Sequence, residues 1–276
     1  MQYNKTYKII IPYTESASPA KKFKIEYVVK ADNRSNALKK AEKEFDAYSE
    51  NNSASWIRIP DQSGIRIWRV FPDDPSTPQF IDKLIEKLPD KNPEKTIAIL
   101  KQLGKLEDST ASSKVISQMK SDTPQIVVEA VNTLGNIGDP TSFFAVKNAY
   151  FQNDNLDIKK AVINNLLKLA LPEDNIISFY KVAIEDPKTR DLVFKLDCPD
   201  LIPLWLAQIS NKKEYDLVKK NVLKQGEKAL KVIVMVESNH PQVLSYASKL
   251  LKELEPMAIE HQWEDWILAT KKYELL

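Results

Sequence analysis

The sequence LGNIGDP at residues 134–140 decides the fold of most of this chain of 276 residues. Segments with helical periodicity lie on both sides of it. A small residue at Gly135 lets two helices pack closely, and Gly138 can adopt the positive φ that ends a helix. Pro140 follows where the next helix would start. The sequence therefore predicts a turn between two packed helices.

The segment that carries this turn recurs along the chain. Leu103 lies 31 residues before Leu134, and Leu167 lies 33 residues after it. A period near 30 residues with two helices in each unit is typical of an α-solenoid. We predict about six repeats over residues 79–276. The clear copies are residues 93–108, 124–140, 156–172 and 241–256, with looser copies at 192–203 and 217–236.

The turn at residues 134–140 resembles the consensus turn of HEAT-like repeats of the type found in phycobilisome lyases. The turns at residues 106–108 and 171–174 have drifted and lack the second glycine. The resemblance implies a solenoid of helical hairpins whose second helices line a concave binding face. Those helices would be residues 111–119, 141–150, 175–184, 200–209 and 256–269. Candidate partner-binding residues on them are Lys147, Tyr150, Tyr180 and Lys181.

Residues 1–71 follow a different pattern. Apolar residues alternate with others over residues 7–13 and 23–29, which indicates two half-buried strands. A helix with an apolar stripe follows over residues 33–48, and two more strands follow at 55–59 and 65–71. We predict a small α+β domain of order ββαββ. The expected fold class is therefore mostly α, with an α-solenoid of HEAT-like hairpins preceded by this domain.

A proline-rich linker at residues 72–78 separates the two predicted domains, 1–71 and 79–276. It contains three prolines in seven residues, which makes it semi-rigid. The charge also divides there. Residues 1–71 hold 13 Lys+Arg and 8 Asp+Glu, a net of +5, so the remaining residues carry −3 of the total of +2. A basic domain thus precedes a mildly acidic one.

The two final strands of the small domain suggest a binding face. If they form an antiparallel hairpin that pairs Ile57 with Ile67, both isoleucines face the helix. The opposite face then carries the candidate partner-binding residues Trp56, Arg58, Arg66 and Trp68. Like charges across a ladder are unfavourable unless an anionic group lies between them. The face would dock onto the acidic part of the same chain or bind an external acidic partner, including single-stranded nucleic acid by stacking.

The sequence carries no motif for a known reaction. The chain has one cysteine, two histidines and five glycines, and no Walker loop, dinucleotide fingerprint, G-x-S-x-G or H-E-x-x-H. Asp197 beside Cys198 disfavours a reactive thiolate. We therefore expect no catalytic residue, no cofactor and no metal.

The leading functional hypothesis is a non-enzymatic protein–protein interaction scaffold or adaptor. Its expected partner is another protein with an acidic or extended surface. One alternative, which rests on the repeat resemblance alone, is a bilin lyase or lyase-like chaperone. Another is a nucleic-acid-binding protein that acts through its basic N-terminal domain. Residues 1–5 do not begin a signal peptide and no apolar run approaches membrane-spanning length, so we expect a cytoplasmic protein with no membrane partner.

Overall fold

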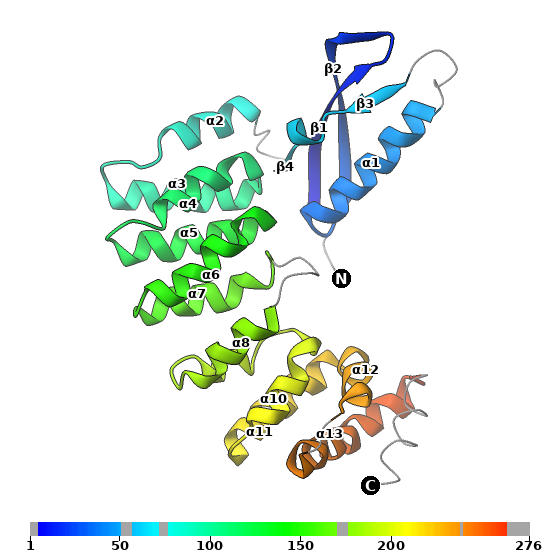
Figure 1. The fold of residues 1–276 in the computed structure, drawn as a ribbon, viewed down its shortest axis with the longest axis vertical. Coiled ribbons are helices and arrows are strands. Elements are labelled where there is room, and N and C mark those ends of the chain that lie inside the picture. The colour runs from blue at the N-terminus through cyan, green and yellow to red at the C-terminus, as the bar shows by residue number, and fades with distance from the viewer. Residues whose placement is uncertain (1–4, 51–56, 72–76, 170–175, 238–239, 264–276) are drawn as a thin grey trace. The chain divides into compact units, whose positions relative to one another are not determined.

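The computed structural model describes residues 5–50, 57–71, 77–169, 176–237 and 240–263. The chain forms two compact units, Met1–Pro172 and Glu173–Leu276. The small sheet domain and the first helical pairs belong to the same unit, on both sides of the proline-rich residues 72–78. Within the described residues the fold is mostly helical with a small N-terminal antiparallel sheet, as the sequence predicts (Figure 1).

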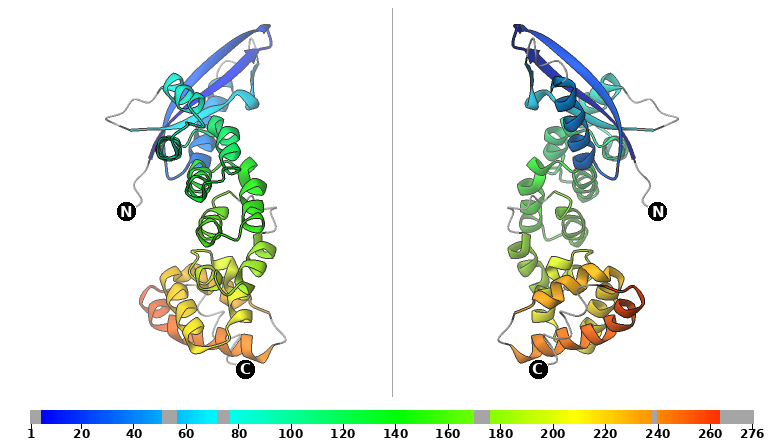
Figure 2. Two further views of the ribbon diagram at one scale, coloured as in Figure 1. Left: turned by 90° about the vertical axis from the view of Figure 1, so that its left-hand side faces the viewer. Right: turned by 90° about the vertical axis from the view of Figure 1, so that its right-hand side faces the viewer.

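The sheet domain has the predicted order ββαββ. Strands β1 and β2 form a long twisted ribbon (Figure 2), and helix α1 covers one face of the sheet. Strands β3 and β4 both pair with the other edge of β1. The elements are β1 (Lys5–Glu15), β2 (Ser18–Ala31), α1 (Arg34–Glu50), β3 (Arg58–Pro60) and β4 (Arg66–Val70).

The predicted hairpin between the last two strands is wrong in its pairing. β3 pairs with Tyr13–Glu15 of β1, and β4 pairs with Thr6–Ile10 of the same strand. They behave as one strand interrupted by the short 3-10 helix η1 (Gln62–Gly64). Pro60, which has no amide donor, ends the first half.

The interruption changes which side chains face α1. Ile67 is opposite Ile9 and is buried, as expected. In β3 the faces are exchanged, so that Arg58 is buried while Ile57 and Ile59 are exposed. Alternate residues of β1 and one stripe of α1 make up most of the hydrophobic core between sheet and helix, and β2 and β4 add to it. Its residues are Tyr7, Ile9, Ile11, Tyr13, Val29, Ala31, Ala37, Ala41, Phe45 and Ile67. As the sequence predicts, strand residues with a period of two pack on helix residues spaced three and four apart.

The helices of the first unit form two layers. α3, α5 and α7 lie side by side, while α4 packs on α5 and α6 packs on α7 (Figure 1). α3, α5 and α7 are the first helices of successive pairs. Each starts at a proline or after an asparagine cap, which explains its well-defined beginning. The helices are α2 (Pro78–Glu86), α3 (Pro93–Leu106), α4 (Ser112–Gln118), α5 (Pro124–Ile137), α6 (Phe143–Gln152) and α7 (Leu156–Leu166).

The turn at residues 134–140 has the predicted geometry. Gly138 ends α5 with φ 68°, a left-handed conformation, and its amide donates to the carbonyl of Leu134. Asp139 then caps the 3-10 helix η3 (Pro140–Ser142). A Cβ added to Gly135 would lie 2.6 Å from the Cβ of Asn165 on α7. The glycine at 135 thus permits the close approach of α5 and α7.

The second unit is also helical in its described part. Its helices are α8 (Ile176–Glu185), α9 (Arg190–Val193), α10 (Ile202–Gln208), α11 (Lys212–Gln225), α12 (Glu227–Met235) and α13 (Pro241–Glu260). A helix was expected to start at Pro256, but this residue lies inside α13. Among the described residues no helix is long and apolar enough to cross a membrane.

Replacing Gly135 with alanine should destabilise the first unit by about 1–3 kcal/mol, because α5 and α7 would have to separate to admit the methyl group. Urea unfolding of the full chain would measure the loss. Gly104→Ala is the matched control, since it gains the same helix propensity but its Cβ would meet the Thr133 Cα at 3.3 Å. An equal loss in both variants would contradict the proposed close approach at Gly135.

Candidate functional site

Glu107 connects the sheet domain to the first helical pair. It ends α3 in the left-handed region with φ 55°, and its carboxylate is buried. Lys5 Nζ lies 2.8 Å from Oε1, and the hydroxyl of Tyr7 donates to Oε2 at 2.7 Å. Arg69 lies 3.6 Å from Oε1. Three side chains of β1 and β4 therefore meet one carboxylate of the helical part.

Asp108 extends this contact. Its side chain is fully buried, accepts a hydrogen bond from Arg66 Nε at 2.8 Å and also caps the 3-10 helix η2 (Ser109–Ala111). Arg66 also lies 2.9 Å from Asp82 on α2. Arg34, at the start of α1, donates to the hydroxyl of Ser109. We call the contacts of Glu107 and Asp108 with Lys5, Tyr7, Arg66 and Arg69 the docking cluster.

The docking cluster shifts the pKa values of Tyr7 and Arg66. Burial and the hydrogen bond to Glu107 raise the pKa of Tyr7 well above its ordinary value, so this residue stays a neutral donor. Burial opposes the charge of Arg66, but its bonds to Asp82 and Asp108 hold its pKa above the usual value. Together with Asp82, the carboxylates of Glu107 and Asp108 balance the charges of Lys5, Arg66 and Arg69 within the chain.

Of the four candidate residues near the end of the sheet domain, two belong to this internal contact region. Arg66 is in the docking cluster, and Trp68 is 1% exposed on β4, which lies against α3 and η2. Arg58 faces α1 instead, with its guanidinium 4.1 Å from the ring centre of Tyr48 and 3.4 Å from Glu15. Trp56 lies outside the described residues. Arg58, Arg66 and Trp68 are therefore occupied internally.

The four candidates on the second helices separate into core and surface residues. Tyr150 and Tyr180 are buried in their respective units, so the expectation that they face a partner is wrong. Tyr180 is among the largest fully buried side chains, and the ammonium of Lys159 on α7 lies over the ring of Tyr150. Lys147 is half-buried with its ammonium over the ring of Phe143, and Lys181 is exposed.

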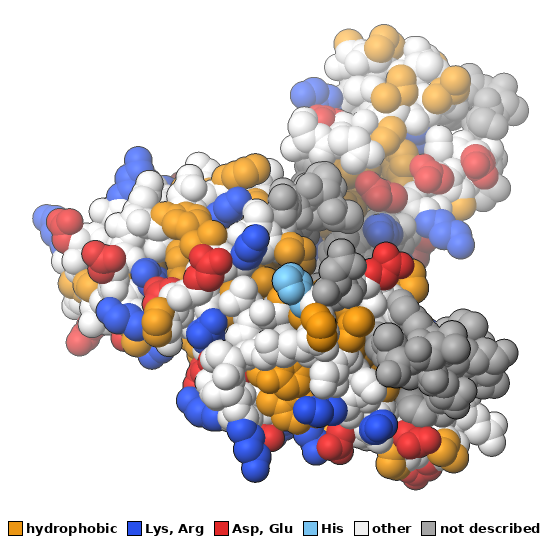
Figure 3. Space-filling view, turned by 60° about the horizontal axis from the view of Figure 1, so that its bottom comes forward, with side chains coloured by type: hydrophobic (Ala, Val, Ile, Leu, Met, Phe, Trp, Pro, Cys, Tyr) orange, Lys and Arg blue, Asp and Glu red, His pale blue; other side chains and the backbone are white. Residues whose placement is uncertain are grey.

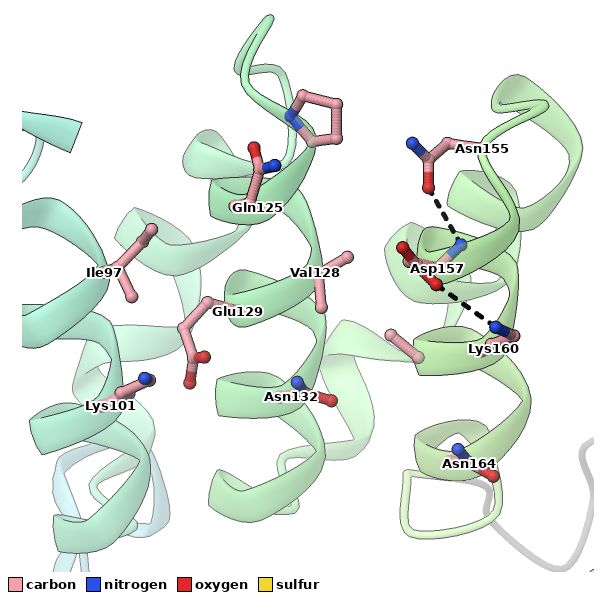
Figure 4. A pocket seen from close by; sticks show the side chains of 12 residues that line it. Ile97, Lys101, Gln125, Val128, Glu129, Asn132, Asn155, Asp157, Lys160 and Asn164 are labelled. Carbon is pink, nitrogen blue, oxygen red and sulfur yellow. Dashed lines mark hydrogen bonds and ion pairs between the residues drawn. The ribbon is translucent and has the colours of Figure 1, made fainter. Parts of the chain in front are cut away.

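A groove of ≈ 640 Å³ crosses the first helices of the first unit instead (Figure 4). Apolar side chains, including Ile97 and Val128, line it together with carboxamides and charged groups. We call it the α3–α5–α7 groove. The polar residues that line it are Lys101, Gln125, Glu129, Asn132, Asn155, Asp157, Lys160 and Asn164.

The polar groups of the groove differ in the hydrogen bonds and ion pairs that they make. Asn132 Oδ1 accepts from Asn165 Nδ2 at 2.8 Å, which turns the other end of the Asn132 amide toward the groove. Asp157 lies 3.3 Å from Lys160. Burial raises the pKa of Glu129, and the nearby Lys101 opposes this effect. Glu129 is thus a carboxylate whose charge is disfavoured by partial burial and only partly compensated by Lys101.

The sequence did not predict this groove, because the repeat resemblance directs attention to the second helices. One signal was present: Asn132 and Asn165 stand 33 residues apart, at equivalent positions of successive copies. In the folded chain these amides bind each other, and Asn164 beside them lines the groove. The spacing of the two asparagines does not indicate which side of α5 and α7 forms the groove.

The described residues show no arrangement typical of catalysis. Burial raises the pKa of the Cys198 thiol, and Asp200 and Asp197 act in the same direction, as the sequence predicts for a thiol that is not activated. No group of three or more His, Cys, Asp or Glu side chains among them could hold a metal ion. On the face shown in Figure 3, basic and acidic side chains are interspersed.

Comparisons with known proteins give a likeness to solved structures and none to a family or a curated protein. The sequence matches no protein-family model and no curated protein. Among solved structures, it is similar to human deoxyhypusine hydroxylase in complex with glycerol. The TM-score is 0.32 and the identity 14%, over 72% of this chain and 84% of that chain. At this level the likeness carries no information on what this chain does.

Glu107→Gln should lower the free energy of unfolding of the first unit by about 2 kcal/mol, because Lys5 and Arg69 lose their buried counter-charge while both remain partly exposed. Chemical denaturation would measure the change. Asp82→Asn, which removes an exposed partner of Arg66, should cost less than about 1 kcal/mol. If the two variants lose equal stability, the docking cluster does not depend on the buried carboxylate.

Glu129→Gln should stabilise the first unit at neutral pH. The folded-state pKa of this carboxyl lies above its ordinary value of 4.5, so the folded chain binds the proton more tightly and stability falls as the pH rises past that value. The amide cannot ionise, so the gain should vanish below pH 4.5. Unfolding free energies across this pH range test it, with exposed Glu86→Gln as control. A gain that is constant with pH would refute the burial effect.

Proposed function

We propose that this chain is a HEAT-like repeat protein of the phycobilisome-lyase type that acts as a protein–protein interaction module. Its binding site is the α3–α5–α7 groove, and its ligand is an extended polypeptide segment of a partner protein. The observation that carries the proposal is the composition of the groove, which combines carboxamides, both signs of charge and apolar side chains along three adjacent helices.

Carboxamides suit the backbone of an extended peptide. Each Asn or Gln side chain offers an acceptor and two donors, as a peptide bond offers an acceptor and a donor. An extended segment has no internal hydrogen bonds and leaves its amides to be satisfied by the surface on which it lies. Gln125, Asn132 and Asn164 come from two different helices of the groove, so they can contact successive residues of one segment.

The charges of the groove favour a segment of mixed or neutral charge. Lys101 and Lys160 are accompanied by Glu129 and Asp157, so the groove has no excess of one sign. Of the two expected partner surfaces, the extended one fits better than the acidic one. A donor from the segment that reached Glu129 would relieve the cost of its burial.

The two alternative functions find less support in the placement of their residues. Arg58 and Arg66, which would bind nucleic acid, are engaged with Glu15, Asp82 and Asp108. Lys147 and Lys181, which would bind the propionates of a bilin, belong to different units and neither lines the α3–α5–α7 groove. We therefore do not propose either activity.

Peptide display against the full chain would test the groove. Selected peptides should lose about tenfold in affinity for the double variant Gln125→Ala/Asn164→Ala, which removes two exposed amides without touching the core. Lys147→Ala, on the second helix α6, is the control and should bind as the wild type does. If the control weakens binding and the double variant does not, the binding face is that of the second helices.

A further inference from the structure

A second cavity lies where the sheet domain meets the turns of the helical part. It has a volume of ≈ 430 Å³ and is lined from β1, from the start of α1 and from the turns that follow α3, α5 and α7. This junction crevice is separate from the α3–α5–α7 groove, with which it shares no lining residue. Its volume is in the range of sites for small molecules.

The charged lining of the junction crevice is mainly cationic. Lys5, Arg34 and Lys168 come from three different elements and line it together with one carboxylate, Glu107. That carboxylate is already bound by Tyr7 and by Arg69 in addition to Lys5. The lining thus holds three cations and one carboxylate whose acceptor capacity is largely used, which leaves the lining with a net positive charge.

Burial disfavours the charge of two of these cations, and for Lys168 a neighbouring cation adds to the effect. Burial lowers the pKa of Lys168, and the positive charge of Lys5 lowers it further. Burial also lowers the pKa of Arg34, although the negative charges of Asp139, Asp108 and Glu107 oppose this effect. Arg34 Nε is buried and has no hydrogen-bond acceptor. Like charges held near one another and an unsatisfied donor are relieved by an anion.

Backbone groups add to this field. The 17-residue helix α1 begins at Arg34, so the positive end of its dipole lies at the crevice beside Asn33 and Ser35. Asn33 caps the helix by accepting from the amide of Asn36. The hydroxyl of Ser35 and the amide of Asn136 are further polar groups of the lining.

We propose that the junction crevice binds a small molecule through a phosphate monoester group. A dianion with several acceptor oxygens matches three cations and a helix N-terminus better than a monoanion does. Bound there, it would contact the sheet domain and the helical turns at once, and would add to the docking cluster. This site does not depend on the proposed peptide groove.

Isothermal titration of the full-length protein at low ionic strength would test the site. The probes are inorganic phosphate and glycerol 3-phosphate, with glycerol as the uncharged control and succinate as a dicarboxylate. Both phosphates should bind and glycerol should not. Absence of phosphate binding at millimolar concentration, or tighter binding of succinate, would overturn the proposal.

Lys168→Gln should weaken binding of both phosphates about tenfold, because it removes one of the three cations of the crevice. The residue is exposed, so the variant should keep its fold. Lys114→Gln on α4 removes the same charge outside the crevice and should leave the affinity unchanged. An equal loss in both variants would mean that phosphate responds only to net charge. Unchanged affinity in Lys168→Gln would equally overturn the assigned site.

Discussion

The buried carboxylate of Glu107 is the contact on which the first unit depends. In the next helical pair the equivalent position is Gly138, and both residues have positive φ, 55° and 68°. A side chain in this conformation costs roughly 1–2 kcal/mol relative to glycine. The cost is offset because the glutamate reaches Lys5, Tyr7 and Arg69 of the sheet domain. The turn after α3 therefore lacks the second glycine of the repeat because its glutamate binds the sheet domain.

The docking cluster also explains the uneven distribution of charge along the chain. Taken alone, the net charge of +5 on residues 1–71 is compatible with an external acidic partner. Much of it is instead matched by the carboxylates of Glu107, Asp108 and Asp82. Charge counted by domain cannot distinguish a docking surface from a partner surface, because both need complementary charge. Of the two readings left open for the Arg66 and Trp68 face, internal docking fits the geometry.

The sequence predicts local structure here better than it predicts the site. The turn at 134–140, the ββαββ order and the helix starts follow from backbone preferences of Gly, Pro and Asn, which act within a few residues. β3 and β4 pair with different parts of the same edge of β1. This pairing depends on contacts between distant segments, so no local sequence pattern predicts it. Likewise, tyrosine is common both at binding surfaces and in cores. Only the packed structure shows that Tyr150 and Tyr180 are buried.

Gly135 links the fold to both proposed sites. Because it has no Cβ, Asn165 of α7 can lie against α5, where its amide nitrogen donates to Asn132 Oδ1 and to the carbonyl of Ala161. Its oxygen accepts from Lys168 Nζ at 2.8 Å. Asn132 lines the α3–α5–α7 groove and Lys168 lines the junction crevice. One buried amide thus positions a side chain at each site, and its own position depends on the glycine that the repeat turn requires.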